Sequence, residues 1–105
     1  MVNVALSPGS GSDAFRAAWQ ERLIPALERF GPELVIISAG FDAHRLDPLA
    51  ELTVETEDFA WLSAELVGAA DRLCAGRIVS LLEGGYNLDA LATGVAVHVR
   101  ALLGV

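Results

Sequence analysis

The sequence predicts an α/β fold with a mainly parallel sheet. Segments with the character of β-strands alternate along the chain with segments whose apolar residues recur at helical spacing. Strands that alternate with helices form parallel crossover units. The segments 34–38 and 78–82 are apolar at four of their five positions, which is typical of strands covered on both faces. Together these observations indicate about three strands and three helices, arranged as half of a doubly wound sheet.

The N-terminal part of the chain predicts a strand and then a helix. Side chains alternate in character over residues 2–6, which favours a short strand. We expect Ser12 or Asp13 to cap the helix that follows. Pro25 lies inside this helix, and its ring would clash with the preceding turn, so we expect a kink or break there. The apolar residues of this helix recur at steps of three or four: Phe15, Trp19, Leu23, Leu27 and Phe30.

The rest of the chain predicts two further helices around the segment 78–82. Gly76 ends the second helix, and His98 lies beside the apolar face of the third as a packed or half-exposed residue. The apolar face of the second helix consists of Phe59, Leu62, Leu66, Ala69 and Leu73. That of the third consists of Leu88, Leu91, Val95, Val99 and Leu102. Loops 39–55 and 83–87 therefore follow parallel strands, at the sheet edge where such folds bind ligands.

Composition limits the classes of function. The chain has 105 residues, at most one domain, and a formal net charge of −7. An acidic surface repels nucleic acid, and no apolar stretch is long enough to cross a membrane, so we expect neither partner. The single Cys74 excludes an internal disulfide framework and is best interpreted as a small core residue. The start of the chain has no signal-peptide pattern, so we expect a cytoplasmic location.

The chain is unusually apolar for its size. Hydrophobic residues make up 53% of the sequence, and the mean hydropathy is +0.47. A domain this small buries only about 60–70% of its unfolded surface, so part of this apolar surface has to remain uncovered. We therefore expect self-association, or association with a missing N-terminal part.

The first loop contains residue types that bind metals. Asp42 follows a buried strand directly, where a carboxylate needs a partner or a metal ion. His44 could be a second ligand, although an exposed loop residue is the better interpretation. Asp47 and Pro48 indicate a turn in which Asp47 binds its own backbone. A cap without any chemical role remains the alternative for Asp42.

The second loop combines two glycines with a phenol. Gly84 and Gly85 allow the backbone to approach a ligand closely or to adopt a positive φ. Tyr86 would then lie near the strand end, where its hydroxyl could stabilise an oxyanion. The alternative is a tight turn with Tyr86 packed beneath it. The glycine spacing lacks a phosphate-binding pattern, so we do not expect a nucleotide site.

These two loops together resemble the histone deacetylase superfamily, which includes acetoin-utilisation-type proteins and acetylpolyamine amidohydrolases of bacteria. The resemblance covers about residues 2–104. It depends on two motifs in the same order, Ser-Ala-Gly-Phe-Asp-Ala-His at 38–44 with Asp-Pro-Leu at 47–49, and Leu-Glu-Gly-Gly-Tyr-Asn at 82–87.

The resemblance implies a zinc-dependent hydrolase of acyl amides, on lysine or polyamines, with an arginase-like three-layer α/β fold. By position, Asp42 matches a zinc ligand and Tyr86 the catalytic tyrosine that donates to the substrate carbonyl. Gly84 and Gly85 match residues beside the acyl channel, and Leu49 matches a channel-lining residue. An arginase-type hydrolase is disfavoured, because it requires a second carboxylate where this chain has His44.

The sequence departs from the family by lacking its N-terminal parts. The resemblance places a histidine pair and an Asp-x-His stretch N-terminal to the region that matches this chain, and no part of residues 1–105 matches that region of the family. A catalytic zinc needs three protein ligands. We therefore expect residues 1–105 to be the C-terminal fragment of a catalytic domain, inactive alone and not holding zinc alone. One half of a two-chain enzyme and a non-enzymatic α/β interaction module remain alternatives.

Overall fold

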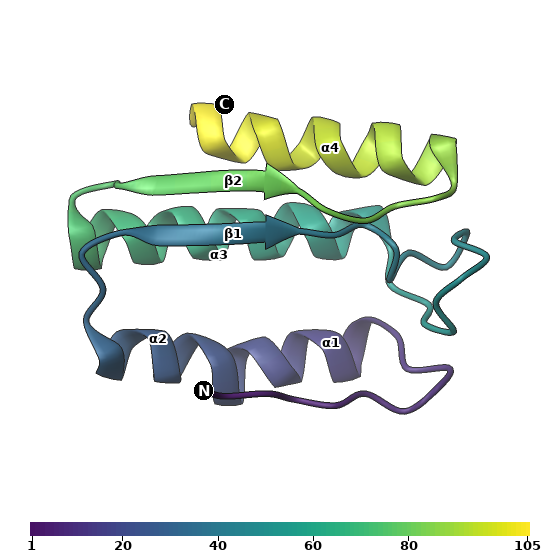
Figure 1. The fold of residues 1–105 in the computed structure, drawn as a ribbon, viewed down its shortest axis with the longest axis horizontal. Helices are drawn as coiled ribbons and strands as arrows, with labels where there is room; N and C mark the ends of the chain where they lie inside the picture. The colour runs from purple at the N-terminus through teal and green to yellow at the C-terminus, as the bar shows by residue number, and fades with distance from the viewer.

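The computed structural model describes residues 1–105 and confirms an α/β fold with a parallel sheet (Figure 1). Its two strands are both parts of strand–helix units, as expected for parallel crossovers. In chain order the elements are α1 (Ser12–Ala18), the π-helix η1 (Trp19–Leu23), α2 (Ile24–Phe30), β1 (Val35–Ala39), α3 (Thr56–Cys74), β2 (Ile78–Leu82) and α4 (Leu88–Leu103).

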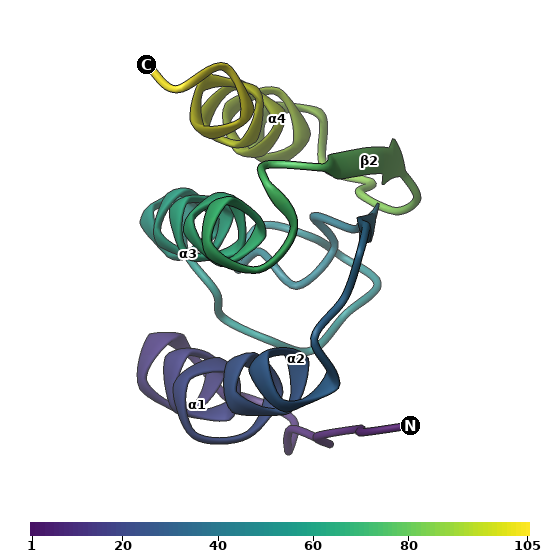
Figure 2. The same ribbon diagram turned by 90° about the vertical axis from the view of Figure 1, so that its left-hand side faces the viewer.

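The sheet has helices on one face only. β1 and β2 pair in parallel, with Val35 opposite Ile78 and Ala39 opposite Leu82. All the helices lie on the same side of these strands (Figure 2). On the other side Val79 and Leu81 are 47% and 55% exposed. The strands of this chain are therefore covered on one face and not on both as expected, because no element of the chain reaches the second face, and the three-layer arrangement of the whole domain stays a prediction.

The expected first strand is absent, so the sheet has two strands instead of three. Residues 2–6 are not assigned to any strand, and they run past the α1–α2 segment, away from β1 (Figure 1). Their alternating pattern still has an effect, because Leu6 packs against the core. A strand requires a neighbour to pair with its backbone groups, and the described chain places none beside this segment.

The first helical segment accommodates Pro25 without a break. The N–H of Ile24 donates to the carbonyl of Trp19, five residues earlier, so the chain makes a π-turn before the proline. Pro25 then occupies the first turn of α2, where its missing N–H costs little. The expected cap at Ser12 or Asp13 is wrong. The residue before α1 is Gly11, so no side chain caps the first turn of this helix. The Ser12 hydroxyl donates instead to the carboxylate of Asp58 on α3.

Helix α3 crosses the centre of the molecule and has a defined end at each side. A reciprocal capping box between Glu55 and Asp58 begins it. Ala75 and Gly76, both with positive φ, end it, as Gly76 predicted. Its buried side includes Cys74, in agreement with the sequence. No helix of the chain is long and apolar enough to span a membrane.

Two helix faces differ from those predicted. Phe30, at the end of α2, is 80% exposed. In α4 the buried positions are Ala90, Gly94 and His98, whereas Leu88 and Val99 are exposed. Small residues are buried because α4 packs closely against the loop after β1. The spacing of apolar residues along the chain does not predict such a close approach between two elements.

The main hydrophobic core lies under the carboxyl end of β1. It consists of Phe15, Ala39, Phe41, Val54 and Phe59. The rings of Phe41 and Phe59 meet edge to face with centroids 5.2 Å apart. The core thus ends where the two candidate loops begin, so that rigid packing supports the site.

Candidate active-site edge and its relatives

The two candidate loops meet at the carboxyl edge of the sheet. The N–H of Glu83 donates to the carbonyl of Ala39 at 2.9 Å, and the N–H of Phe41 donates to that of Gly84 at 2.8 Å. These bonds continue the pairing of β1 and β2 beyond the strands. Residues 39–42 and 83–84 are thereby fixed side by side, as the parallel-sheet argument predicted.

Asp42 lies between two glycines that have no room for a side chain. A Cβ atom at Gly40 would stand 2.9 Å from Oδ1 of Asp42, and one at Gly84 would stand 3.2 Å from both carboxylate oxygens. The carboxylate is half-buried, and the hydrogen bonds of this edge are made by other groups. A half-buried carboxylate without a partner retains its full capacity to accept a cation or a proton donor.

Phe41 fixes the backbone next to Asp42. Its ring lies in a socket made by Gly94, Gly85, Phe59 and His98. A Cβ atom at Gly94 would stand 2.6 Å from the ring, so only glycine fits at this position of α4. The packing of Phe41 therefore determines where the Asp42 side chain starts.

Asp47 connects the two loops by one carboxylate. Its Oδ1 accepts from the N–H of Leu49 at 2.9 Å, which is the turn that the sequence predicted. Its Oδ2 accepts from the N–H of Tyr86 at 2.8 Å, a bond across 39 positions that sequence reasoning missed. Burial alone would raise the pKa of Asp47, but backbone N–H groups, those of Leu49 and Tyr86 foremost, hold it below its usual value.

Tyr86 and Leu49 lie on the surface beside this edge. Their exposed fractions are 57% and 68%, and the Tyr86 hydroxyl has no hydrogen-bond partner. The tight turn with a packed tyrosine, the alternative reading of this loop, is thus not what the structure contains. Gly85 precedes Tyr86 with φ of 142°, a conformation that other residues rarely adopt. This turn leaves the phenol free to contact another molecule.

His44 is not the exposed loop residue that the sequence favoured. It is 3% exposed and parallel to the ring of Phe59. Its Nδ1 accepts from the N–H of Leu46, and its Nε2 lies 3.1 Å from the hydroxyl of Thr56. Both ring nitrogens are therefore occupied, which removes His44 as a second metal ligand. Two of its three contacts, with Thr56 and Phe59, come from α3, and a local interpretation of the loop does not include them.

His98 joins three elements of the fold, which the sequence did not indicate beyond a packed helix residue. Its Nδ1 and Nε2 both lie 2.8 Å from hydroxyls, those of Ser63 on α3 and Ser80 on β2. The Ser63 hydroxyl also donates to the carbonyl of Phe59. Burial lowers the pKa of His98, because no acidic group compensates for its desolvation.

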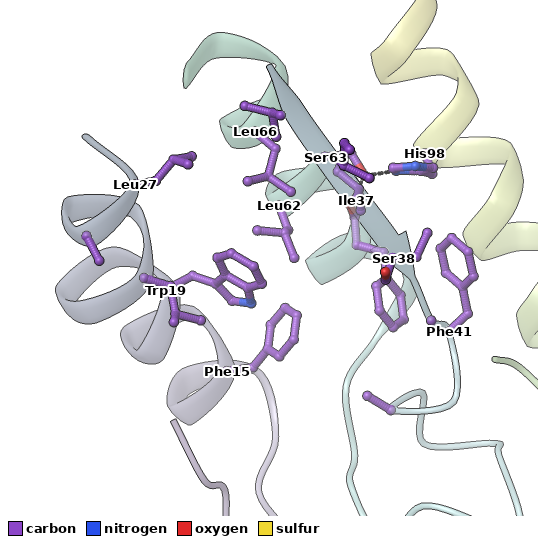
Figure 3. Close-up of a pocket in the computed structure, with 18 of the residues that line it drawn as sticks. Phe15, Trp19, Leu27, Ile37, Ser38, Phe41, Leu62, Ser63, Leu66 and His98 are labelled. Atoms are coloured by element: carbon purple, nitrogen blue, oxygen red, sulfur yellow. Dashed lines mark hydrogen bonds between the residues drawn. The ribbon is translucent and has the colours of Figure 1, made fainter. Parts of the chain in front are cut away.

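A separate apolar groove follows the outer edge of β1. It has a volume of about 450 Å³ and lies between β1 and the α1–α2 segment, with Phe15, Trp19 and Leu27 on one wall and Ile37 on the other (Figure 3). The peptide groups of β1 alternate in direction: the N–H of Val35 and the carbonyl of Ala39 point to β2. Those of Ile36 and Ser38 therefore point to the groove side.

The described residues contain no group of three His, Cys, Asp or Glu side chains that could hold a metal ion. Asp42 alone fits as a ligand, because its carboxylate is half-buried and unpartnered between two glycines. A catalytic zinc needs three protein ligands, so the residues present do not suffice for it.

Comparison with known proteins gives one consistent family. Residues 1–102 match the histone deacetylase domain. "Histone deacetylase 10, chloroplastic" of Oryza sativa subsp. japonica is 48% identical over 103 residues, which cover 98% of this chain and 23% of the rice protein. "Histone deacetylase-like amidohydrolase" of Pseudomonas aeruginosa is 44% identical over 86 residues, covering 82% and 23%. The structure of the histone deacetylase Clr3 superposes with a TM-score of 0.84 at 31% identity, covering 94% of this chain and 16% of that one.

The fold and the two motifs thus define a histone deacetylase-like protein, and the chain belongs to the histone deacetylase domain family. The family expected from the sequence is confirmed. The chain spans 23% of the length of the rice and Pseudomonas relatives. The rice relative is named as chloroplastic, and a cytoplasmic location of this chain stays a prediction.

Proposed function

We propose that this chain is the C-terminal portion of a zinc-dependent deacylase domain with an arginase-like fold, of the bacterial acetoin-utilisation or acetylpolyamine amidohydrolase type. The domain hydrolyses acyl amides of lysine or of polyamines. The observation that carries the proposal is the unpartnered carboxylate of Asp42. It lies against Gly84, and Gly84 belongs to the same loop as Tyr86. Family membership supports an amide hydrolase, and this arrangement supports the roles of the individual residues.

Each site residue has a chemical role in the proposed reaction. Asp42 provides one of the zinc ligands. When bound, zinc supplies Lewis-acid polarisation of the substrate carbonyl and lowers the pKa of water. The hydroxyl of Tyr86 donates a hydrogen bond to the carbonyl oxygen as negative charge develops on it. Gly84 and Gly85 lack side chains and leave space for the acyl group, and Leu49 provides an apolar wall for the carbon chain that carries it.

Residues 1–105 alone are inactive in this proposal. They provide one of three ligands, and the remaining ligands and the histidine pair come from the part of the domain that the longer relatives also contain. The groove beside β1 supports this completion. Its walls are apolar, and the peptide groups of Ile36 and Ser38 offer a strand edge. We propose that a strand of the rest of the domain fills it.

A chimera tests the proposal. Residues 1–105 replace the homologous segment of the rice relative, to which 98% of the chain aligns. We expect the chimera to bind zinc and to hydrolyse an acetylated lysine peptide or an acetylated polyamine, whereas the 105-residue chain does neither.

Two variants of the chimera separate the roles. Asp42→Asn should lose zinc, measured as metal content. Tyr86→Phe should keep zinc and lower kcat by about 10²–10³-fold, the usual cost of one oxyanion donor. Asp89→Asn is the matched control. Asp89 is exposed on α4, and its replacement by asparagine removes one negative charge, as Asp42→Asn does. The proposal is wrong if the 105-residue chain hydrolyses these substrates alone, or if Tyr86→Phe leaves the rate of a zinc-loaded chimera unchanged.

A further inference from the structure

We propose that Asp47 is a positioning residue that directs Tyr86 and Leu49 toward the substrate. This inference rests on the proposed function, because it assigns a role through Tyr86. Asp47 is 6% exposed as a residue, and its carboxylate joins the two loops. One oxygen holds the N–H of Leu49 and the other holds the N–H of Tyr86, at 2.9 Å and 2.8 Å. A single side chain thereby sets the spacing between the phenol and the apolar wall.

Tyr86 needs such an anchor because its own surroundings do not orient it. The phenol has no hydrogen-bond partner, and more than half of the side chain is exposed. On one side is Gly85, which has a φ of 142° and, as a glycine, restricts the backbone less than any other residue type. On the other side Asn87 is fixed, because its side chain accepts from the N–H of Ala90 at 2.9 Å and caps α4. The bond to Asp47 is what ties Tyr86 to the first loop.

A carboxylate suits this position better than any other side chain. It offers two oxygens that both accept, so it can hold two N–H groups from different loops at once. An asparagine has one accepting oxygen, and its amide nitrogen would face a donor. Asp47→Asn therefore keeps the size of the side chain and one of the two bonds. Because asparagine forms the same local turn, the bond to Leu49 is the one kept, and the bond to Tyr86 is the one given up.

A double-mutant cycle in the zinc-loaded chimera tests the inference. Asp47→Asn, Tyr86→Phe and the double variant are compared by kcat/KM, with Asp89→Asn as the charge control. If Asp47 acts by directing the Tyr86 hydroxyl, Asp47→Asn lowers kcat/KM by about tenfold when Tyr86 is present and has little effect when it is phenylalanine. A merely structural role lowers kcat/KM by the same factor in both backgrounds, and that result overturns the inference.

A second measurement uses the 105-residue chain without zinc. The amide hydrogen of Tyr86 should exchange with solvent at least about tenfold faster in Asp47→Asn, and it should not change in Asp89→Asn. Unchanged exchange at the Tyr86 amide overturns the inference. Should Asp47→Asn fail to fold, Asp47→Ser, which keeps a turn-forming oxygen, takes its place in both experiments.

The outcomes distinguish this inference from the function on which it rests. An active chimera with equal losses in both backgrounds removes the positioning role and leaves the proposed function intact. A folded chimera that hydrolyses no acyl amide, even with Asp47 in place, overturns the proposed function and the positioning role with it.

Discussion

The ring of Phe41 occupies the space that a side chain at Gly94 would need, since a Cβ atom there would stand 2.6 Å from Cδ1 of the ring. Both residues are buried, and Phe41 also contacts His98 and Phe59. Helix α4 can therefore approach the loop after β1 only because Gly94 is small. The approach holds the backbone that precedes Asp42.

We expect Gly94→Ala to destabilise the chain by about 1–3 kcal/mol, the usual cost of overpacking a core. Urea unfolding followed by circular dichroism measures this change. Gly68→Ala is the control within α3, because its Cβ atom would meet only the Arg72 side chain at an ordinary 3.5 Å. That variant should gain up to about 1 kcal/mol from helix propensity. Equal changes in unfolding free energy for Gly94→Ala and Gly68→Ala would contradict the conclusion that the Phe41 ring fills the space beside Gly94.

Asp58 supports the start of α3 and its contact with α1. Its buried carboxylate accepts from Arg16 at 2.7 Å, from the N–H of Glu55 at 2.9 Å and from Ser12. We expect Asp58→Ala to cost about 1–3 kcal/mol of unfolding free energy. The cost stays below that of a fully buried pair, because Arg16 is 37% exposed and water can solvate it. Glu65→Ala, an exposed position on the same helix, should change stability by less than about 0.5 kcal/mol.

The pH dependence of stability near neutrality should depend on His98. Its pKa is lowered from 6.5 by burial, and its ring contacts the hydroxyls of Ser63 and Ser80 and the ring of Phe41. The unfolded chain therefore binds a proton at a higher pH than the folded chain. The stabilisation is fully present above pH 6.5 and decreases as the pH falls toward the lowered pKa.

Two measurements check this dependence. The NMR titration of the His98 ring should give a pKa below 6.5, and the unfolding free energy should decrease from pH 7 to pH 5. His98→Asn should have a weaker slope over this range. A ring that titrates above 6.5 would contradict the prediction.

The local features of the fold were predictable from sequence because they depend on short-range patterns. The strands at 35–39 and 78–82 follow from apolar runs, and the end of α3 follows from Gly76. The turn at Asp47 follows from the Asp-Pro pair. Each of these depends on residues within a few positions of one another.

What the sequence could not provide are contacts between distant segments. The bond between Asp47 and Tyr86 spans 39 positions, and His98 meets Ser63 and Ser80 from two other elements. The expected strand at 2–6 failed for a related reason. An alternating pattern records a preference for extended backbone, and a strand forms only where a neighbour accepts its hydrogen bonds.

The open edge of β1 gives the last prediction. The amides of Ile36 and Ser38 point to the groove, while that of Val35 donates to the carbonyl of Arg77, the residue before β2. In the 105-residue chain the first two amides should exchange quickly with deuterium, and Val35 should exchange slowly. In the chimera a docked strand should slow the exchange of Ile36 and Ser38 by at least about tenfold, because it accepts their hydrogen bonds. Mass spectrometry of the β1 peptide measures both states. If Ile36 and Ser38 exchange as quickly in the chimera as in the 105-residue chain, the proposal of a strand from the rest of the domain is wrong.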